Sequence, residues 1–153
     1  MRTLELKIPP MLVAAIAAGV IWLVARAAPA LRLEIPLRGV LAVVIALAGF
    51  GVAIAGVVSF RRARTTVNPL NPAAASALVV SGLYRVTRSP MYLGVLLCLL
   101  GLVVWFGSVP ALVVLPLFVA YMNRFQIIQE EAALRALFGA EFDSYRARVR
   151  RWI

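Results

Sequence analysis

Residues 81–94 form a polar, turn-rich stretch whose residue types suit anion binding. The stretch carries two fixed cations, Arg85 and Arg88, and it runs directly into a long apolar segment. Pro90 is favoured in the first turn of a helix, where its missing N–H costs nothing, and Ser89 then takes the N-cap position. A helix N-terminus beside arginines is a binding place for a carboxylate or a phosphate. The alternative is a positively charged loop at the cytoplasmic end of a membrane helix.

Paired carboxylates near the end of the chain are the second candidate for chemistry. Glu130 and Glu131 follow an apolar segment, in a chain with only 6 acidic residues against 16 basic ones. Carboxylates accept hydrogen bonds from hydroxyl and ammonium groups, so the pair suits a polar ligand. The alternative is that the two carboxylates form ion pairs with arginines of the same protein, namely Arg61, Arg85, Arg88 or Arg135.

Several kinds of catalytic site are excluded by composition. The chain has no histidine, which removes the commonest metal ligand and the commonest general base. Its single cysteine, Cys98, lies among leucines and can form no disulfide within the chain. No cluster of cysteines or carboxylates takes the place of histidine, so we expect no metal site.

The overall composition is that of an integral membrane protein. Hydrophobic residues make up 63% of the chain and charged residues 14%, compared with roughly 45–50% and about 25% in soluble domains. The net charge of +10 is explained by membrane topology and by attraction to anionic lipid. Nucleic acid is not expected as a partner, because the chain contains no soluble basic module.

The hydrophobic pattern predicts an all-α, polytopic bundle of about four transmembrane helices. The first two spans are residues 8–25 and 39–60, and each is long enough to cross the bilayer. Residues 91–122 are too long for one span, and we predict a helical hairpin that turns at Gly107 and Ser108. Residues 65–77 contain two Asn-Pro pairs and are expected to be a non-helical connector. Small residues at Gly49, Gly51 and Gly56 are expected to serve helix packing.

The distribution of basic residues predicts the orientation in the membrane. Of the 16 basic residues, Arg26, Arg32 and Arg38 lie on one side of the predicted bundle and all the others lie on the opposite side. The positive-inside rule then places both termini, residues 81–94 and the tail in the cytoplasm. The expected location is a bacterial inner membrane.

The tail is expected to form two cytoplasmic helices. Residues 124–138 have a helical apolar pattern, and Gly139 is a plausible C-cap. Residues 141–149 then form a short amphipathic helix with one apolar face. That face carries Phe142, Tyr145 and Val149, while four arginines are directed to lipid headgroups: Arg146, Arg148, Arg150 and Arg151.

Four segments in these two cytoplasmic pieces resemble a known family. The segments are Gly82-Leu-Tyr-Arg85, Arg88-Ser-Pro-Met-Tyr-Leu-Gly94, Glu130-Glu-Ala-Ala-Leu134 and Phe138-Gly-Ala-Glu-Phe-Asp-Ser-Tyr145. Their order and spacing are similar to the C-terminal half of the isoprenylcysteine carboxyl methyltransferase and phospholipid methyltransferase superfamily. The resemblance covers residues 81–153, the expected cofactor-binding half of a single domain that spans 1–153. Residues 1–80, with two spans and a connector, carry no signature.

The resemblance implies a membrane enzyme that transfers the methyl group of S-adenosylmethionine and releases S-adenosylhomocysteine. The implied cofactor pocket has one wall made by Arg88, Ser89, Pro90, Tyr92, Leu93 and Gly94. Glu130 and Glu131 form the opposite wall, and Tyr84 and Tyr92 lie against the adenine or the sulfonium. Arg124 and Glu131 are the candidate catalytic residues. Methyl transfer itself needs little acid–base help, so positioning can supply most of the rate.

Two positions depart from the family pattern and bear on the acceptor. Many members have histidine at the position of Ser89. The isoprenylcysteine enzymes have a functional arginine at the position of Gln126, and the nearest arginine here is Arg124. A prenylated carboxylate therefore ranks level with an amine or another lipid headgroup as the lipophilic acceptor.

Two other functional classes stay open from the sequence alone. A protein of this fold without catalysis would serve as a membrane accessory or assembly factor. Retained cofactor binding would distinguish the enzyme from such a factor. A transporter or channel is disfavoured, because residues 39–60 and 91–122 contain no ionisable side chain apart from tyrosine and cysteine to line a path.

Overall fold

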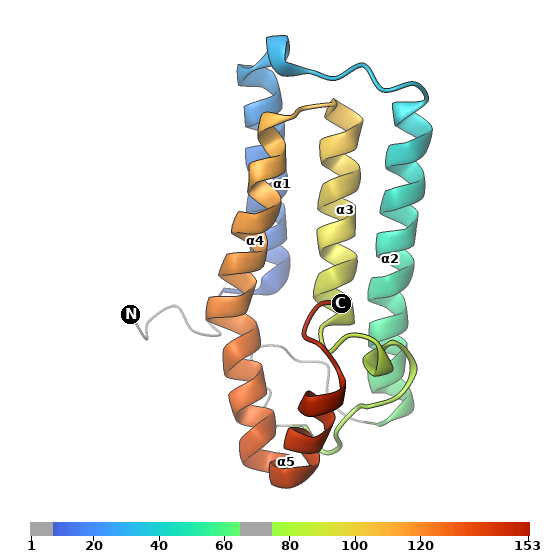
Figure 1. Cartoon of the computed structure of the whole chain (residues 1–153), viewed down its shortest axis with the longest axis vertical. Coiled ribbons are helices and arrows are strands. Elements are labelled where there is room, and N and C mark those ends of the chain that lie inside the picture. The colour runs from blue at the N-terminus through green and yellow to red at the C-terminus, as the bar shows by residue number, and fades with distance from the viewer. Residues whose placement is uncertain (1–7, 65–74) are drawn as a thin grey trace.

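The computed structural model describes residues 8–64 and 75–153, which form an all-α membrane bundle. Helix α3 (Pro90–Phe106) stands between α2 (Arg38–Arg62) on one side and the pair α1 (Pro10–Ala27) and α4 (Val114–Met122) on the other (Figure 1). The start of α1, the end of α2, the start of α3 and the tail lie toward the same end of the bundle. Most of the predicted connector, residues 65–74, lies outside the described residues.

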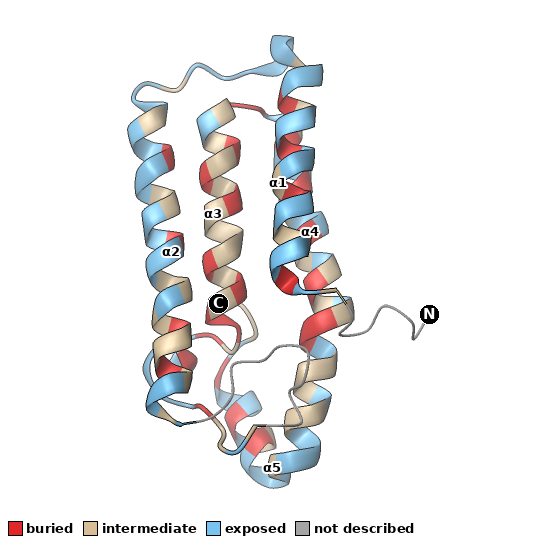
Figure 2. Cartoon of the chain, turned by 180° about the vertical axis from the view of Figure 1, so that it is seen from behind, coloured by how far each residue is buried: buried red, intermediate tan, exposed pale blue. Residues whose placement is uncertain are grey.

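The spans are close to those expected from hydropathy. Helix α1, helix α2 and the helical stretch Pro110–Arg148 are each long and apolar enough to cross a membrane. Helix α3 is apolar and has 17 residues, the short end of the roughly 17–25 that a span needs. Exposed residues cover much of α1 and α2 (Figure 2), as expected of apolar helices that face lipid. The all-α membrane bundle is therefore confirmed.

The end of the bundle opposite the tail is closed by two connectors that bond to one another. Helix α3 ends at Gly107, whose φ of 61° is unfavourable for other residues. A Cβ at this position would come 2.6 Å from the carbonyl oxygen of Leu33, so the turn also requires a residue without a side chain. The N–H of Leu33 donates to the carbonyl of Gly107 at 2.8 Å. Arg32 donates to the carbonyl of Ala25 at 3.0 Å and so satisfies the last turn of α1.

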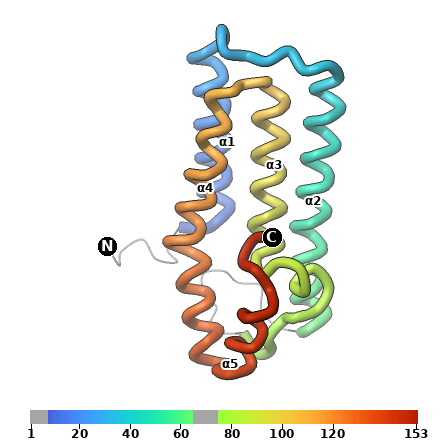
Figure 3. Tube along the Cα trace, viewed as in Figure 1, coloured from blue at the N-terminus to red at the C-terminus, as the bar shows by residue number. Residues whose placement is uncertain are grey.

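The second arm of the hairpin continues far beyond the apolar part. It begins with the 3₁₀ turn η4 (Pro110–Val113), and α4 then passes through the π-helix η5 (Asn123–Ile127) into α5 (Ile128–Arg148). Gly139 has φ 50° and ψ −122°, and the chain after it turns back toward the start of α3 (Figure 3). The break that the sequence predicted at this glycine is confirmed.

Helices α2 and α3 cross closely because glycines face each other. A Cβ on Gly49 would lie 2.6 Å from the carbonyl oxygen of Gly94, and a Cβ on Gly94 would lie 2.5 Å from that of Gly49. A Cβ on Gly56 would come 2.7 Å from the side chain of Met91, whereas Gly51 has no neighbour within 4 Å. The predicted packing role is confirmed for Gly49 and Gly56 and is wrong for Gly51, which faces outward.

Two apolar clusters hold the described residues together. The larger joins α1, α3, α4 and η5, and the smaller joins the tail to residues 78–84. Phe142, Tyr145 and Val149 are all buried in the smaller cluster. The predicted apolar face of the second tail helix is therefore confirmed, and it covers this protein's own core.

Candidate functional site

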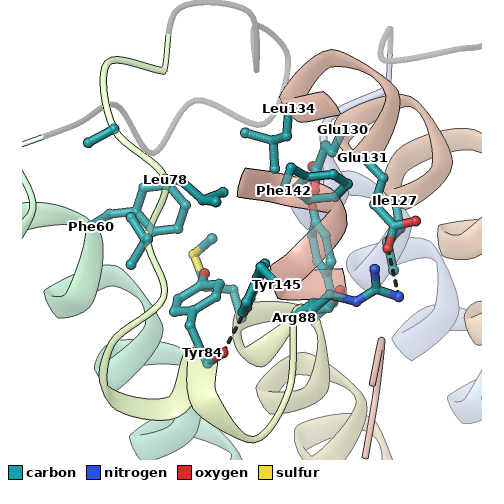
Figure 4. A pocket seen from close by; sticks show the side chains of 15 residues that line it. Phe60, Leu78, Tyr84, Arg88, Ile127, Glu130, Glu131, Leu134, Phe142 and Tyr145 are labelled. Carbon is teal, nitrogen blue, oxygen red and sulfur yellow. Dashed lines mark hydrogen bonds and ion pairs between the residues drawn. The ribbon is translucent and has the colours of Figure 1, made fainter. Parts of the chain in front are cut away.

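A cavity at the tail end of the bundle brings the two chemically distinctive stretches together. It measures about 620 Å³ when the open solvent at its mouth is included. Its walls come from the end of α2, the segment before η3 (Gly82–Arg85), the start of α3, and the helices η5 and α5 (Figure 4). The lining residues are Phe60, Ala77, Leu78, Val79, Tyr84, Arg88, Ser89, Met91, Tyr92, Ile127, Glu130, Glu131, Leu134, Phe142 and Tyr145.

Glu131 lies between two guanidinium groups. Arg151 approaches it with two nitrogens, Nε at 3.1 Å from Oε1 and Nη2 at 2.6 Å from Oε2. Arg88 makes a single contact, with its Nη2 at 3.3 Å from Oε1. The alternative in which the paired glutamates bind arginines of the same protein is therefore borne out for Glu131 with Arg88, and Arg151 is a second partner that the sequence did not indicate.

Arg88 keeps unused hydrogen-bond donors in this cavity. Its side chain is only 10% exposed, and its Nε and Nη1 have no partner among the described residues. Burial lowers the pKa of Arg88, while the nearby Glu131 carboxylate opposes that effect by favouring the charged form. Arginine stays protonated even so, and buried unpaired donors are costly unless a ligand or water accepts from them. The site therefore suits an anionic group.

Two tyrosines fix the other side of the cavity. The hydroxyl of Tyr92 donates to Oε1 of Glu130, which joins α3 to α5. The hydroxyl of Tyr145 donates to the carbonyl of Tyr84 at 2.7 Å, which joins the tail to η3. Burial raises the pKa of Tyr84 above its ordinary value, and the Glu130 charge acts in the same direction. Tyr84 therefore keeps its proton, and the remaining oxygen of Glu130 can accept from a ligand hydroxyl or ammonium.

An apolar wall faces these polar groups. It includes Phe60 from α2, Leu78 from the preceding segment, and Leu134 and Phe142 from α5 (Figure 4). The ring of Phe60 meets the edge of the Tyr84 ring at a centroid distance of 5.4 Å. A ligand in the cavity therefore meets charge on one side and apolar surface on the other.

Six of the residues expected from the sequence line this cavity together: Tyr84, Arg88, Ser89, Tyr92, Glu130 and Glu131. Pro90, Leu93 and Gly94 are not part of the lining. Pro90 is the first residue of α3, and Gly94 belongs to the crossing with α2. Arg124 lies on η5 with its guanidinium 5.7 Å from the Phe125 ring centre, also outside the lining.

The start of α3 differs in one detail from the expectation. Ser89 does stand at the N-cap with Pro90 following it, but the Ser89 side chain makes no capping hydrogen bond. The backbone N–H of Ser89 instead donates to Oγ1 of Thr87 at 3.1 Å. Thr87 is buried, and its hydroxyl donates to the carbonyl of Arg151 at 3.0 Å. The residues around Thr87 gave no sign of its bond to the Arg151 carbonyl, because Arg151 is 64 positions away in the sequence.

Gln126, the position where the isoprenylcysteine enzymes have arginine, has a structural contact here. Its side chain is fully buried, and its Nε2 donates to the carbonyl of Ile8 at 2.7 Å. The amide therefore ties η5 to the residues just before α1. A charged arginine in its place would have to find other partners in this buried position.

Metal chemistry finds no support in the described residues. They contain no group of three histidine, cysteine, aspartate or glutamate side chains placed to hold an ion. The polar side chains that line the cavity are one guanidinium, two carboxylates, three phenols and the Ser89 hydroxyl, which suit an organic ligand that carries both charges.

Comparisons with known proteins bear on what this cavity does. An uncharacterized protein of Haemophilus influenzae is 41% identical over 63 residues, which is 41% of this chain and 100% of that protein. No solved structure matches the chain significantly. The profile of the phospholipid methyltransferase family matches residues 37–141, which include α2, α3 and the paired glutamates. The chain therefore belongs to the phospholipid methyltransferase family, within the isoprenylcysteine carboxyl methyltransferase-like superfamily of membrane methyltransferases.

Proposed function

We propose that this protein transfers a methyl group from S-adenosylmethionine to a lipophilic acceptor at the cytoplasmic face of the membrane. The observation that carries the proposal is the cavity itself, in which a buried arginine with unused donors faces paired carboxylates beside an apolar wall. The family supports methyl transfer, and the helices of the bundle support an acceptor that is dissolved in lipid.

The residues of the cavity fit the polar parts of this methyl donor. Arg88 offers two nitrogens unpaired among the described residues, Nε and Nη1, to the amino-acid carboxylate, and Glu130 and Glu131 offer acceptors to the ammonium and ribose hydroxyls. Tyr84 and Tyr92 offer aromatic surface to the adenine or the sulfonium. When bound, the donor supplies an activated methyl group whose leaving group is a neutral thioether.

The protein's contribution to the reaction is then mainly positional. The Tyr92–Glu130 hydrogen bond and the Glu131 ion pairs hold the polar wall in one geometry before any ligand arrives. The apolar wall excludes water and aligns an acceptor that enters from the lipid side. Glu131 remains our candidate catalytic residue within the cavity, whereas Arg124, which lies outside the lining, would act on a part of the acceptor that extends beyond the cavity. Alignment of donor and acceptor is worth several orders of magnitude in rate.

The position of the cavity in the bundle supports an acceptor at headgroup depth. The cavity lies where α2 ends at Arg62 and α3 begins at Pro90, next to the basic end of the molecule. An acceptor with an apolar tail could therefore place its polar group in the cavity while the tail stays in the bilayer. Anionic lipid around this end is an expected partner.

Two measurements on purified protein in nanodiscs test the proposal. Calorimetric titration should show saturable binding of S-adenosylmethionine and S-adenosylhomocysteine, with empty nanodiscs as the control. Incubation with methyl-labelled donor and an extract of the native membrane should move label into the organic phase. Label found only in water-soluble products would contradict the lipophilic acceptor. Absence of donor binding would contradict the proposed enzyme.

A further inference from the structure

The last described residues return to the site as an extended strap, residues 149–153 (Figure 3). The N–H of Arg88 donates to the carbonyl of Arg150 at 3.0 Å, and Thr87 and Arg150 form a parallel bridge. At its other end the strap is held by Trp152, whose Nε1 donates to Oδ1 of Asn123 at 3.0 Å. The strap therefore connects the backbone before α3 with the π-helix η5.

The Arg151 side chain extends from this strap and forms a bidentate ion pair with the Glu131 carboxylate. Its Nε and Nη2 bind different oxygens of the carboxylate at 3.1 Å and 2.6 Å, the geometry in which a guanidinium holds a carboxylate most firmly. Arg88 reaches the same carboxylate with one nitrogen only, at 3.3 Å. Glu131 is therefore oriented by Arg151 and touched by Arg88.

The orientation of Glu131 decides how many donors Arg88 keeps for a ligand. While Arg151 binds both oxygens of Glu131, Arg88 makes only the single contact. Without Arg151, the Glu131 carboxylate would be free to turn onto the Arg88 guanidinium, which is already within contact distance. The two Arg88 nitrogens that have no partner among the described residues, Nε and Nη1, would then be partly consumed.

The charges of Arg88, Arg151 and Glu131 also favour an anion beside Arg88 while Arg151 is present. Arg88 and Arg151 carry two positive charges against the one negative charge of Glu131, and Arg88 and Glu131 are only 10% and 12% exposed. Among these three side chains alone there is an excess of one positive charge, which favours an anion beside Arg88. Removal of Arg151 would leave a neutral pair with no excess charge for a ligand.

We infer that Arg151 is a positioning residue for the methyl donor: it holds Glu131 so that Arg88 can bind the donor's carboxylate. This inference rests on the proposed function, because it takes the anion at Arg88 to be the amino-acid carboxylate of the donor. It assigns a share in ligand selectivity to the strap, which contacts lining residues but does not itself line the cavity.

A pair of ligands separates this role from a purely structural one. S-adenosylhomocysteine carries the amino-acid carboxylate, whereas 5′-methylthioadenosine has the same adenosine and thioether without it. Calorimetry should show that Arg151→Ala weakens binding of S-adenosylhomocysteine by roughly 10- to 100-fold, the usual effect of losing a charge-assisted hydrogen bond. Binding of 5′-methylthioadenosine should stay within about two-fold of the parent, a difference too small to reflect a lost hydrogen bond.

Two further variants complete the experiment. Arg151→Lys keeps the charge and loses the bidentate geometry, so its affinity ratio for the two ligands should lie between those of the parent and Arg151→Ala. It also serves where Arg151→Ala fails to fold, because the ratio is measured within one protein. Arg148→Ala removes an exposed arginine of the same tail whose Nε donates to the carbonyl of Ser144, and its ratio should match the parent.

Each other outcome has a distinct meaning. Equal weakening of both ligands in the Arg151 variants would overturn the inference and leave the strap a structural element. Unchanged binding of both would overturn it as well. Failure of the parent protein to bind S-adenosylhomocysteine would contradict the proposed function, and this inference with it.

Discussion

Arg88 is the residue on which the chemistry of the cavity depends most. It is the guanidinium that lines the cavity, and its backbone, its charge and one of its nitrogens are all engaged by other parts of the chain. The two nitrogens left over are buried and have no partner among the described residues. A buried charged donor of this kind stabilises a bound anion strongly, because no water competes for it.

Arg88→Ala should therefore abolish most of the thermal stabilisation that S-adenosylhomocysteine confers. Ligand binding stabilises a protein by mass action, by about 2.7 kcal/mol when the ligand is present at 100 times its dissociation constant. Glu131→Gln should also reduce the thermal shift, since it removes a carboxylate that we propose accepts hydrogen bonds from the ammonium or ribose hydroxyls of the ligand. Melting curves in nanodiscs with and without ligand give the measurement.

Arg85→Ala is the matched control for this experiment. Arg85 belongs to the same short stretch, but it is exposed and does not line the cavity. The Arg85→Ala variant should keep the full rise in melting temperature that S-adenosylhomocysteine causes. If Arg88→Ala and Glu131→Gln also keep this rise, the ligand binds elsewhere.

At the scale of elements, the cavity depends on the contact between α2 and α3. Helix α2 brings Phe60 to the apolar wall and α3 brings Tyr92 to the polar wall, so their distance sets the width between the walls. The crossing at Gly49 and Gly94 brings two backbones together, and lipid gives these helices no hydrophobic reason to associate. Close backbone packing is therefore the force that holds α2 in place.

A pair of alanine substitutions within α2 tests this contact. The Cβ of Gly49→Ala would come 2.6 Å from a backbone oxygen of α3, which cannot move aside as a side chain can. We expect a loss of about 1–3 kcal/mol in unfolding free energy, the usual cost of overpacking, together with weaker binding of S-adenosylhomocysteine. Thermal melting and calorimetry measure the two effects.

Gly51→Ala adds the same methyl group two residues away, where nothing lies within 4 Å. It should leave melting and binding unchanged or raise the stability slightly, because alanine favours the helix more than glycine does. Equal effects of the two substitutions would show that the crossing does not control the cavity.

At the scale of the whole molecule, the end that holds the cavity is also the end that carries most of the basic side chains. Arg61, Arg62, Arg85 and the arginines of the tail lie there, whereas Arg26, Arg32 and Arg38 lie at the other end. The positive-inside rule then supports our proposal that the cavity faces the cytoplasm. Ser108, in the turn between α3 and η4, is only 1% exposed, so a cysteine placed there would be inaccessible to a labelling reagent.

Cysteine labelling at two exposed alanines tests the orientation in a Cys98→Ala background. Ala30 lies in η1 (Pro29–Leu31) at the end of the bundle opposite the tail, and Ala140 follows the break in α5. A membrane-impermeant maleimide should label Ala30→Cys in intact cells and Ala140→Cys only after permeabilisation. Neither substitution alters the basic residues that set the topology. The opposite pattern of labelling would contradict the proposed orientation.

The sequence by itself determined the class of the protein, the approximate spans and most of the polar residues of the cavity. These properties follow from local composition and local pattern: apolar length predicts a span, and an unusual glutamate pair in a basic chain predicts a site. The break at Gly139 and the turn at Gly107 were also predictable, since a single glycine marks each one.

Only the tertiary structure decided which arginine holds Glu131 and which of the implied residues line the cavity. Arg151 was expected to face lipid headgroups, and Gly94 was expected in the cofactor pocket. Neither outcome is local, because Arg151 is positioned by a strap bound to Thr87 and Gly94 by a helix that crosses it at Gly49. Partners separated by many residues are brought together by packing, and packing depends on the whole chain at once.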